Sequence, residues 1–207
     1  MDLNEEAYSA DHILQRALQQ KDEQWLSVIS HLRHDWMNDI QVLYGYMRLN
    51  KYDKLAAFME TIKQKAAKES SVAKLGVTKL VVYLQMFRIQ CPQILLEVDI
   101  EQELQLTELP VPSERVADAA IAVLDGFIRH TYEASNGEPQ GLQLEWTVQD
   151  EELVLIFDYR GGYREAELND TLRQAVSMNG SGPQWQLETE FEPQWAAITV
   201  RVPFVRE

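Results

Sequence analysis

The chain has 207 residues, a formal net charge of −14 and a single cysteine, Cys91, so it forms no intrachain disulfide. Its composition, 45% hydrophobic and 25% charged, is typical of a soluble globular protein of one or two domains. So acidic a chain is a poor candidate for binding nucleic acid or an anionic membrane. Without a long apolar run or a hydrophobic signal core, the sequence predicts a cytoplasmic protein.

The N-terminal part of the sequence predicts a helical hairpin. Apolar residues recur every three or four positions and fall within about 40° of Trp36 on one helical face, which predicts a buried stripe on a helix from about residue 12 to Leu49. Asn50 and Lys51 mark a turn, and Asp53 is a candidate N-cap for a second helix that lasts to about Val72. The stripe consists of Trp25, Ile29, Leu32, Trp36, Ile40, Leu43 and Met47.

A two-helix hairpin buries little apolar surface by itself, so the stripe needs a further partner. A symmetric homodimer that forms a four-helix bundle is favoured. The alternative is that the hairpin packs on the C-terminal half of its own chain.

After Gly76 the pattern changes to mixed helices and strands, so the chain as a whole is expected to be α+β. The predicted domains are a helical hairpin over residues 1–75 and an α/β domain over residues 76–207. The predicted elements are a helix at 78–90, a strand at 94–100, a helix from Ser113 to near 135–137, strands at 142–148 and 153–159, a helix at 165–178, a loop at 179–183, and a hairpin of strands at 184–192 and 196–204.

Charge is unevenly divided along the chain. Residues 1–70 carry a net charge of −2 and residues 71–207 carry −12, whereas residues 31–68 are locally basic at +3. Two interpretations of the basic segment remain open. It is either ordinary helix-surface charge or a docking surface for an acidic partner or a phosphoryl group.

One histidine stands away from the apolar stripe. His34 lies about 160° around the helix from Trp36, so it is expected on the outside of the bundle, within reach of another protein. Asn38, Gln41 and Gly45 lie within about 40° of it. An exposed histidine is usually only solvated, and His31 is also off the stripe, so periodicity alone does not choose between the two.

The run His34-Asp35-Trp36-Met37-Asn38, followed by Gln41 and by Leu49-Asn50-Lys51-Tyr52-Asp53, resembles the phosphoacceptor helix and turn of the sporulation initiation phosphotransferase B family. It is more loosely similar to the His-Asp/Glu-Phe-x-Asn box of citrate- and dicarboxylate-sensing histidine kinases. The close match covers residues 30–73.

The resemblance implies a homodimeric four-helix bundle and a C-terminal domain shaped like a degenerate histidine-kinase ATPase domain. It also implies a phosphorelay in which His34 accepts a phosphoryl group from the aspartyl-phosphate of one response regulator. His34 then passes the group to the aspartate of a second regulator, which controls sporulation. Asp35 would orient the ring or stabilise its charge, and the regulator would supply Mg²⁺, so no intrinsic cofactor or metal is expected.

Partner contacts are expected around His34. The candidates are Arg33, Asn38, Gln41, Val42 and Gly45, with receiver domains of response regulators as the partners. For Arg33, which would help to balance charge, an ordinary solvated side chain is the simpler interpretation, since it lies about 100° around the helix from His34.

Kinase motifs are incomplete in the C-terminal half. The helix around Asp125 lacks the expected Glu/Asp-x-x-x-Asn pattern, and Asp158 is followed by displaced glycines, Gly161 and Gly162. A second loop, residues 179–183, is short and closed by proline. We therefore expect neither ATP binding nor autophosphorylation. The alternatives to the phosphotransferase are a sensor-type histidine kinase core and a non-enzymatic scaffold that binds regulators.

Overall fold

The computed structural model describes residues 3–101, 104–132, 140–177 and 184–205. The chain divides into two compact units, residues 1–62 and 63–207, and the dividing point lies within the second helix. The predicted domain boundary after residue 75 stays a prediction.

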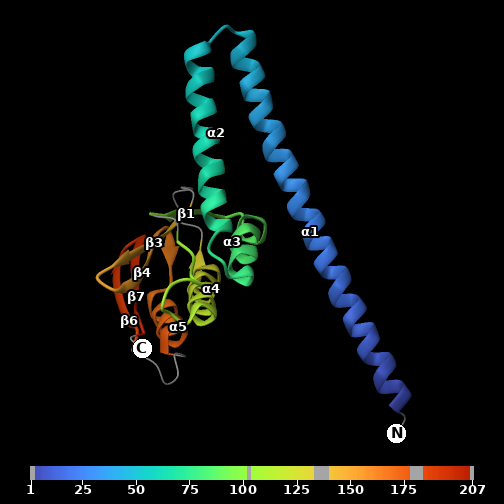
Figure 1. The fold of residues 1–207 in the computed structure, drawn as a ribbon, viewed down its shortest axis with the longest axis vertical. Coiled ribbons are helices and arrows are strands. Elements are labelled where there is room, and N and C mark those ends of the chain that lie inside the picture. Colours follow the sequence, from blue (N-terminus) through green and yellow to red (C-terminus); the bar gives the residue numbers. More distant parts are fainter. Residues whose placement is uncertain (1–2, 102–103, 133–139, 178–183, 206–207) are drawn as a thin grey trace. The chain divides into compact units, whose positions relative to one another are not determined.

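The first unit is a helical hairpin, as predicted (Figure 1). Helix α1 runs from Leu3 to Arg48, and helix α2 runs from Tyr52 to Ala73 and so continues into the second unit. Asn50 adopts a left-handed backbone conformation with φ of 53° and makes the turn. The Tyr46 and Phe58 rings pack edge to face at 6.2 Å and tie the two helices together near this turn.

Two expectations about helix ends are wrong. Helix α1 begins at Leu3 rather than near residue 12, because the residues before the stripe include no glycine or proline that would break the helix. Asp53 is not an N-cap, because α2 already begins at Tyr52, whose hydroxyl donates a hydrogen bond to Asn50 Oδ1 at 3.0 Å. Asp53 lies in the first turn, where its charge complements the helix dipole.

The second unit is a mixed α/β layer built on a five-stranded sheet in the order β1-β3-β4-β7-β6. Strands β1 and β3 are parallel and the other neighbouring pairs are antiparallel. In register, Leu144 lies opposite Phe157, which lies opposite Ile198. The sheet strands are β1 (Ile94–Ile100), β3 (Gln140–Gln149), β4 (Glu152–Arg160), β6 (Gln186–Glu192) and β7 (Trp195–Pro203).

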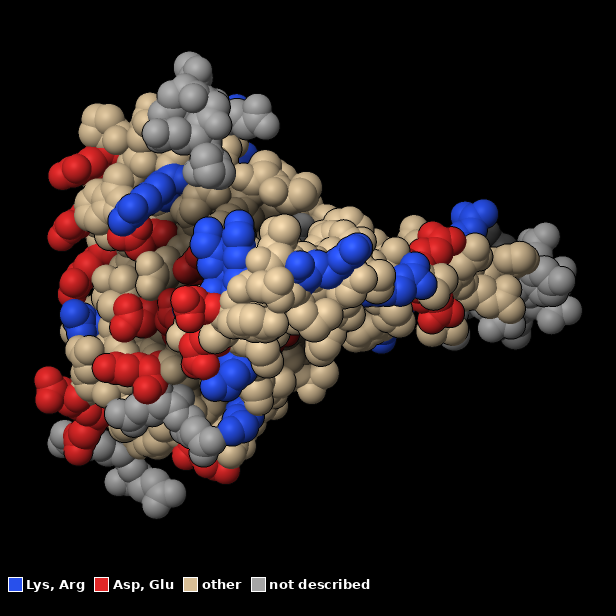
Figure 2. All heavy atoms as spheres, turned by 90° about the horizontal axis from the view of Figure 1, so that it is seen from above, with Lys and Arg blue, Asp and Glu red and all other residues tan. Residues whose placement is uncertain are grey.

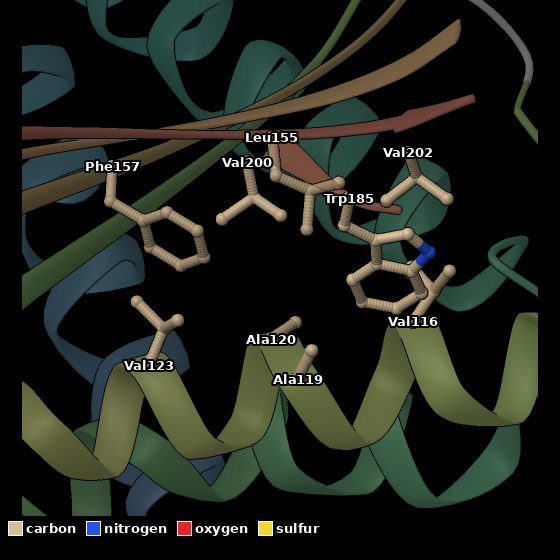
Figure 3. A pocket seen from close by; sticks show the side chains of 9 residues that line it. All are labelled: Val116, Ala119, Ala120, Val123, Leu155, Phe157, Trp185, Val200 and Val202. Atoms are coloured by element: carbon tan, nitrogen blue, oxygen red, sulfur yellow. The ribbon is translucent and has the colours of Figure 1, made fainter. Parts of the chain in front are cut away.

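Three helices, α3 (Thr78–Gln90), α4 (Ser113–His130) and α5 (Glu165–Ser177), cover one face of this sheet (Figure 1). The core between the layers is apolar. A pocket of about 190 Å³ between α4 and the sheet is lined by nine apolar side chains, among them Val123, Phe157 and Trp185 (Figure 3). It is smaller than the roughly 300–1,000 Å³ typical of ligand sites and has no polar group, so it is a packing gap in the core.

A small second sheet was missed by the sequence analysis. Strand β2 (Thr131–Tyr132) pairs antiparallel with β5 (Gly162–Tyr163). Helix α4 therefore ends at His130 instead of near 135–137, because Thr131 leaves the helix to pair with Tyr163. The rest of that predicted helix and the predicted loop at 179–183 lie outside the described residues.

The uncovered face of the five-stranded sheet carries many carboxylates. Asp99 lies opposite Glu145 in register, and Lys68 of α2 forms an ion pair with Asp99 at 2.5 Å. At the sheet edge, β6 alternates exposed and half-buried residues, and its exposed positions include Glu188, Glu190 and Glu192. Figure 2 shows carboxylates gathered on the second unit, in agreement with the net charge of −12 in residues 71–207.

Candidate phosphoacceptor site

His34 lies in the interior of α1, and its side chain is 74% exposed. Helix α1 contains neither glycine nor proline for more than two turns on either side of this position, so the backbone there is regular and its polar groups are satisfied within the helix. The regular backbone gives the side chain a fixed direction. A rigid helix therefore presents the imidazole to solvent, as the sequence predicted for an outward histidine.

Two polar side chains approach the same nitrogen of the His34 ring. The Asn38 amide nitrogen lies 3.2 Å from Nδ1, and Asp35 Oδ1 lies 3.8 Å from Nδ1. Asn38 is one helical turn further along, where a side chain at i+4 stacks over the one at i. Neither contact is made to Nε2, so Nδ1 is the anchored side of the ring.

His31, the alternative candidate, is held differently. Its Nδ1 lies 2.9 Å from the backbone carbonyl of Ser27, one turn earlier in α1. A carbonyl oxygen only accepts hydrogen bonds, so this nitrogen carries the proton. The two histidines therefore differ in their contacts: His31 bonds to the helix backbone, whereas Asn38 and Asp35 of the predicted motif lie near the His34 ring.

The other predicted partner residues lie on α1 around His34. Arg33, Gln41 and Val42 are exposed, and Gly45 is half-buried. Nothing lies within 4 Å of the position that a Cβ atom would occupy at Gly45. Since an interior glycine destabilises a helix by about 1 kcal/mol relative to alanine, the packing of this chain gives no reason for glycine here.

The apolar stripe of α1 is exposed in the single chain. Trp36 is 67% exposed and Ile40 is 51% exposed, and Trp25, Ile29, Leu32 and Met47 are exposed as well. Six large apolar side chains on one helical face form a larger apolar patch than soluble proteins ordinarily expose. The dimeric bundle that was expected to bury this face stays a prediction.

The displaced glycines after β4 have a structural explanation that does not involve phosphate. Gly161 has φ of 150°, and its N–H donates to the carbonyl of Gln194 at 2.9 Å. A Cβ atom at Gly161 would overlap the Tyr159 hydroxyl, and one at Gly162 would lie 2.6 Å from the Tyr132 ring. These glycines make room for aromatic rings, so they do not form the open cradle of backbone N–H groups that holds a phosphate.

Asp125 of α4 also makes structural contacts. Asp125 Oδ1 accepts a hydrogen bond of 2.5 Å from the Tyr83 hydroxyl, and Asp125 Oδ2 lies 3.9 Å from Arg129. Burial and this bond raise the pKa of Tyr83 well above its usual value.

Within the described part of the chain, His, Cys, Asp and Glu side chains form no group of three or more that could hold a metal ion. In the same part, every helix is too short or too polar to cross a membrane.

Comparison with known proteins shows which protein family the hairpin resembles. Residues 15–75 match the family model described as "Sensor_kinase_SpoOB-type, alpha-helical domain". Residues 15–75 form a SpoOB-type alpha-helical domain. The match confirms the resemblance predicted from the His34-to-Asn38 run and the turn that follows.

Relatives of known structure or function are more distant. Over 150 residues the chain is 25% identical to sporulation initiation phosphotransferase B of Bacillus subtilis (strain 168). The matched stretch covers 72% of this chain and 76% of that protein. Histidine kinase AdeS of Acinetobacter baumannii is 12% identical with a TM-score of 0.42, over 84% of this chain and 98% of that one. The catalytic domain of histidine kinase ThkA is 10% identical with a TM-score of 0.44, over 67% and 94%.

Proposed function

We propose that this chain is a phosphorelay phosphotransferase. It accepts a phosphoryl group from the aspartyl-phosphate of one response regulator onto His34 and passes it to the aspartate of a second regulator that controls sporulation. The observation that carries the proposal is the exposed His34 imidazole, anchored at Nδ1 by the side chains of its own motif within a SpoOB-type helical domain. The 25% identity to sporulation initiation phosphotransferase B supports the sporulation assignment.

The chemistry requires one nucleophilic atom. In the first step the Nε2 lone pair of neutral His34 forms a bond to phosphorus, and the P–O bond to the regulator's aspartate breaks with its electron pair on the leaving carboxylate. The ring keeps its Nδ1 proton and becomes positively charged. Transfer to the second regulator reverses these steps. Phosphoryl transfer depends mainly on positioning and electrostatics, so an exposed, oriented histidine suffices on this side of the reaction.

Asp35 supplies the electrostatic part. Its carboxylate lies 3.8 Å from Nδ1 and is only 36% exposed, so it stabilises the positive charge that the ring acquires. Arg33, Gln41, Val42 and Gly45 lie on the same helix as the histidine, within about three turns of it, and would contact the receiver domain. The Mg²⁺ required for the acyl phosphate would come from the regulator.

The exposed apolar stripe supports a homodimer. Two copies of the hairpin would cover the stripes containing Trp36 and Ile40 against each other in a four-helix bundle. His34, about 160° around α1 from Trp36, would then remain outside the bundle. Docking of a regulator and dimerisation would thus use different faces of one helix.

The C-terminal unit is proposed to lack ATP-dependent activity. The Gly161 N–H is bonded to Gln194, and both Gly161 and Gly162 are packed against tyrosine rings. Asp125 is occupied by Tyr83 and Arg129. These contacts support a role in packing, rather than in nucleotide binding, for the residues that stand at the positions of the kinase motifs.

The test is phosphotransfer with purified components. A receiver domain labelled on its aspartate is mixed with the chain, and acid-labile, base-stable label is sought on the chain. Wild type and His31→Gln are expected to take up label, and His34→Gln is expected to take up none while keeping its helical circular dichroism. Label that persists in His34→Gln would overturn the proposal. Label from ATP alone would assign the chain to the kinases, and no label from either source would favour a scaffold.

A further inference from the structure

We propose that strand β1 is a docking edge for an extended segment of another protein, a segment in which apolar and basic residues alternate. Strand β1 (Ile94–Ile100) stands at one end of the five-stranded sheet, so only one of its sides is paired, with β3. An edge strand can accept a further strand from a partner through backbone hydrogen bonds, a mode called β-augmentation. This edge belongs to the second unit and takes no part in the phosphotransfer chemistry proposed above.

The register with β3 shows which backbone groups of β1 remain unpaired. Glu101 N–H donates to the Trp146 carbonyl at 3.2 Å, so the backbone groups of the odd-numbered residues of β1 face β3. Those of Leu96, Val98 and Ile100 face the opposite way, because the direction alternates along a strand. In the described part of the chain, no hydrogen bond is made to the backbone of these three residues. A partner strand would therefore meet three N–H groups and three carbonyls that lack partners there.

The side chains of β1 determine which partner sequence fits. On the helix-covered face of the sheet, Leu96 is 9% exposed, and Val98 and Ile100 are half-buried against the core. Partner side chains beside them would extend that core, so every second residue of the partner should be apolar. On the uncovered face, Glu97 is exposed, and Glu145 of β3 adds a second carboxylate. The intervening residues of the partner should therefore be basic.

One lysine of the chain already makes the contact that a basic partner residue would make. Lys68 forms an ion pair with Asp99 of β1, and the hydrogen bond between them raises the pKa of Lys68. The uncovered face beside β1 thus holds an ammonium group. Glu97, two residues before Asp99, forms no ion pair with a described residue. It is the position at which a lysine or arginine of the partner would bind.

A second copy of the chain fits this edge poorly. If two β1 strands paired antiparallel about Val98, Glu97 of each copy would lie opposite Asp99 of the other. Like charges directly opposite each other destabilise a sheet. The other edge of the sheet, β6, also carries carboxylates, but the central residue on its core side is Thr189 instead of an aliphatic residue. An apolar partner residue is therefore better accommodated beside β1.

The test uses the full chain and a synthetic seven-residue peptide of alternating valine and lysine with blocked ends. Amide hydrogen exchange followed by NMR reports which edge the peptide pairs with. At saturating peptide, exchange at Leu96, Val98 and Ile100 is expected to slow by at least tenfold, while exchange at Thr189 stays unchanged. Absence of protection on β1 at millimolar peptide, or protection on β6 in its place, would overturn the proposal.

Two N-methylated peptides separate backbone pairing from attraction between charges. One carries N-methyl groups on its valines and the other on its lysines, so both keep the same charge. Only the residues of one set direct their N–H groups at β1, so methylation of that set is expected to weaken binding about tenfold, and methylation of the other set much less. Equal binding of the two peptides would refute strand pairing.

A pair of substitutions tests the charge complementarity. Glu97→Gln is expected to weaken binding of the unmethylated peptide about three- to tenfold and to reduce its dependence on salt. Glu190→Gln removes the same charge from the opposite edge and is expected to leave binding unchanged. An equal loss in both variants would show that the peptide responds only to net charge, and the proposal would then be wrong.

Discussion

Replacement of Gly45 by alanine is expected to stabilise the hairpin and to weaken transfer. Gly45 lies 11 residues after His34, which places it on nearly the same face of α1 at a distance of about 16 Å along the axis. An added Cβ atom meets nothing within 4 Å, so the methyl group fits without strain. Removal of an interior glycine should therefore stabilise each helix by about 0.5–1 kcal/mol, or about 1–2 kcal/mol for a dimer.

The effect on transfer has the opposite sign. If the backbone of a receiver domain approaches α1 closely at Gly45, an added methyl group crowds that contact and weakens binding by about 1–3 kcal/mol, the usual range for overpacking. This corresponds to a loss of affinity of about fivefold or more. A general loss of structure cannot produce such a result, because the same variant should be more stable.

The assay combines denaturant unfolding, followed by far-ultraviolet circular dichroism, with binding of a labelled receiver domain. Gly45→Ala should show a higher midpoint and a weaker complex. A higher midpoint with unchanged binding would remove Gly45 from the docking surface. A lower midpoint would contradict the helix-propensity argument itself.

Three further predictions concern the exposed stripe around Trp36, the buried side chain of Tyr159 and the backbone at Gly162. Trp36→Glu should convert the proposed homodimer to monomer in analytical ultracentrifugation, because it places charge on an apolar face, whereas Gln41→Glu should leave the proposed homodimer intact. Burial raises the pKa of Tyr159 to about 12. Between about pH 10 and pH 12 the unfolded chain therefore releases this proton and the folded chain does not, so the free energy of unfolding should fall as pH rises. Tyr159→Phe should reduce the slope of that fall, and an equal slope would contradict the raised pKa of Tyr159. Gly162→Ala should lower the thermal midpoint, because the new Cβ would lie 2.6 Å from the Tyr132 ring, and an unchanged midpoint would show that the ring moves away freely.

Periodicity predicted the long elements because their apolar residues recur regularly. Helix α2 and the β3–β4 pair were expected within a few residues of their observed ends, whereas α1 begins at Leu3, well before its expected start near residue 12. Strands β2 and β5 could not be predicted, because two residues are too few to show alternation. The end of α4 at His130 could not be predicted for the same reason, because the chain leaves the helix there to form β2.

At the candidate site, the sequence predicted the direction of His34 but not its surroundings. Spacing of four residues placed Asn38 over His34, yet the ring nitrogen that it approaches required coordinates. The homodimer expected to cover the Trp36 stripe stays a prediction, since the pattern shows only that a face is apolar and a single chain does not show which surface covers it. The role of Gly161 and Gly162 was hidden because the aromatic ring beside Gly162 comes from a different part of the sequence.

The acidic edge strand β6 has a consequence for aggregation. An edge strand offers unpaired backbone groups to any other sheet, and proteins guard such edges with charged side chains. Glu188, Glu190 and Glu192 lie along this edge. Glu188 forms an ion pair with Arg201, and Glu190 and Glu192 would repel the same residues of a second copy of the sheet that approached the edge. The charge on β6 therefore disfavours strand-to-strand pairing at this edge, so self-association through the apolar stripe of α1 need not lead to pairing of the sheets.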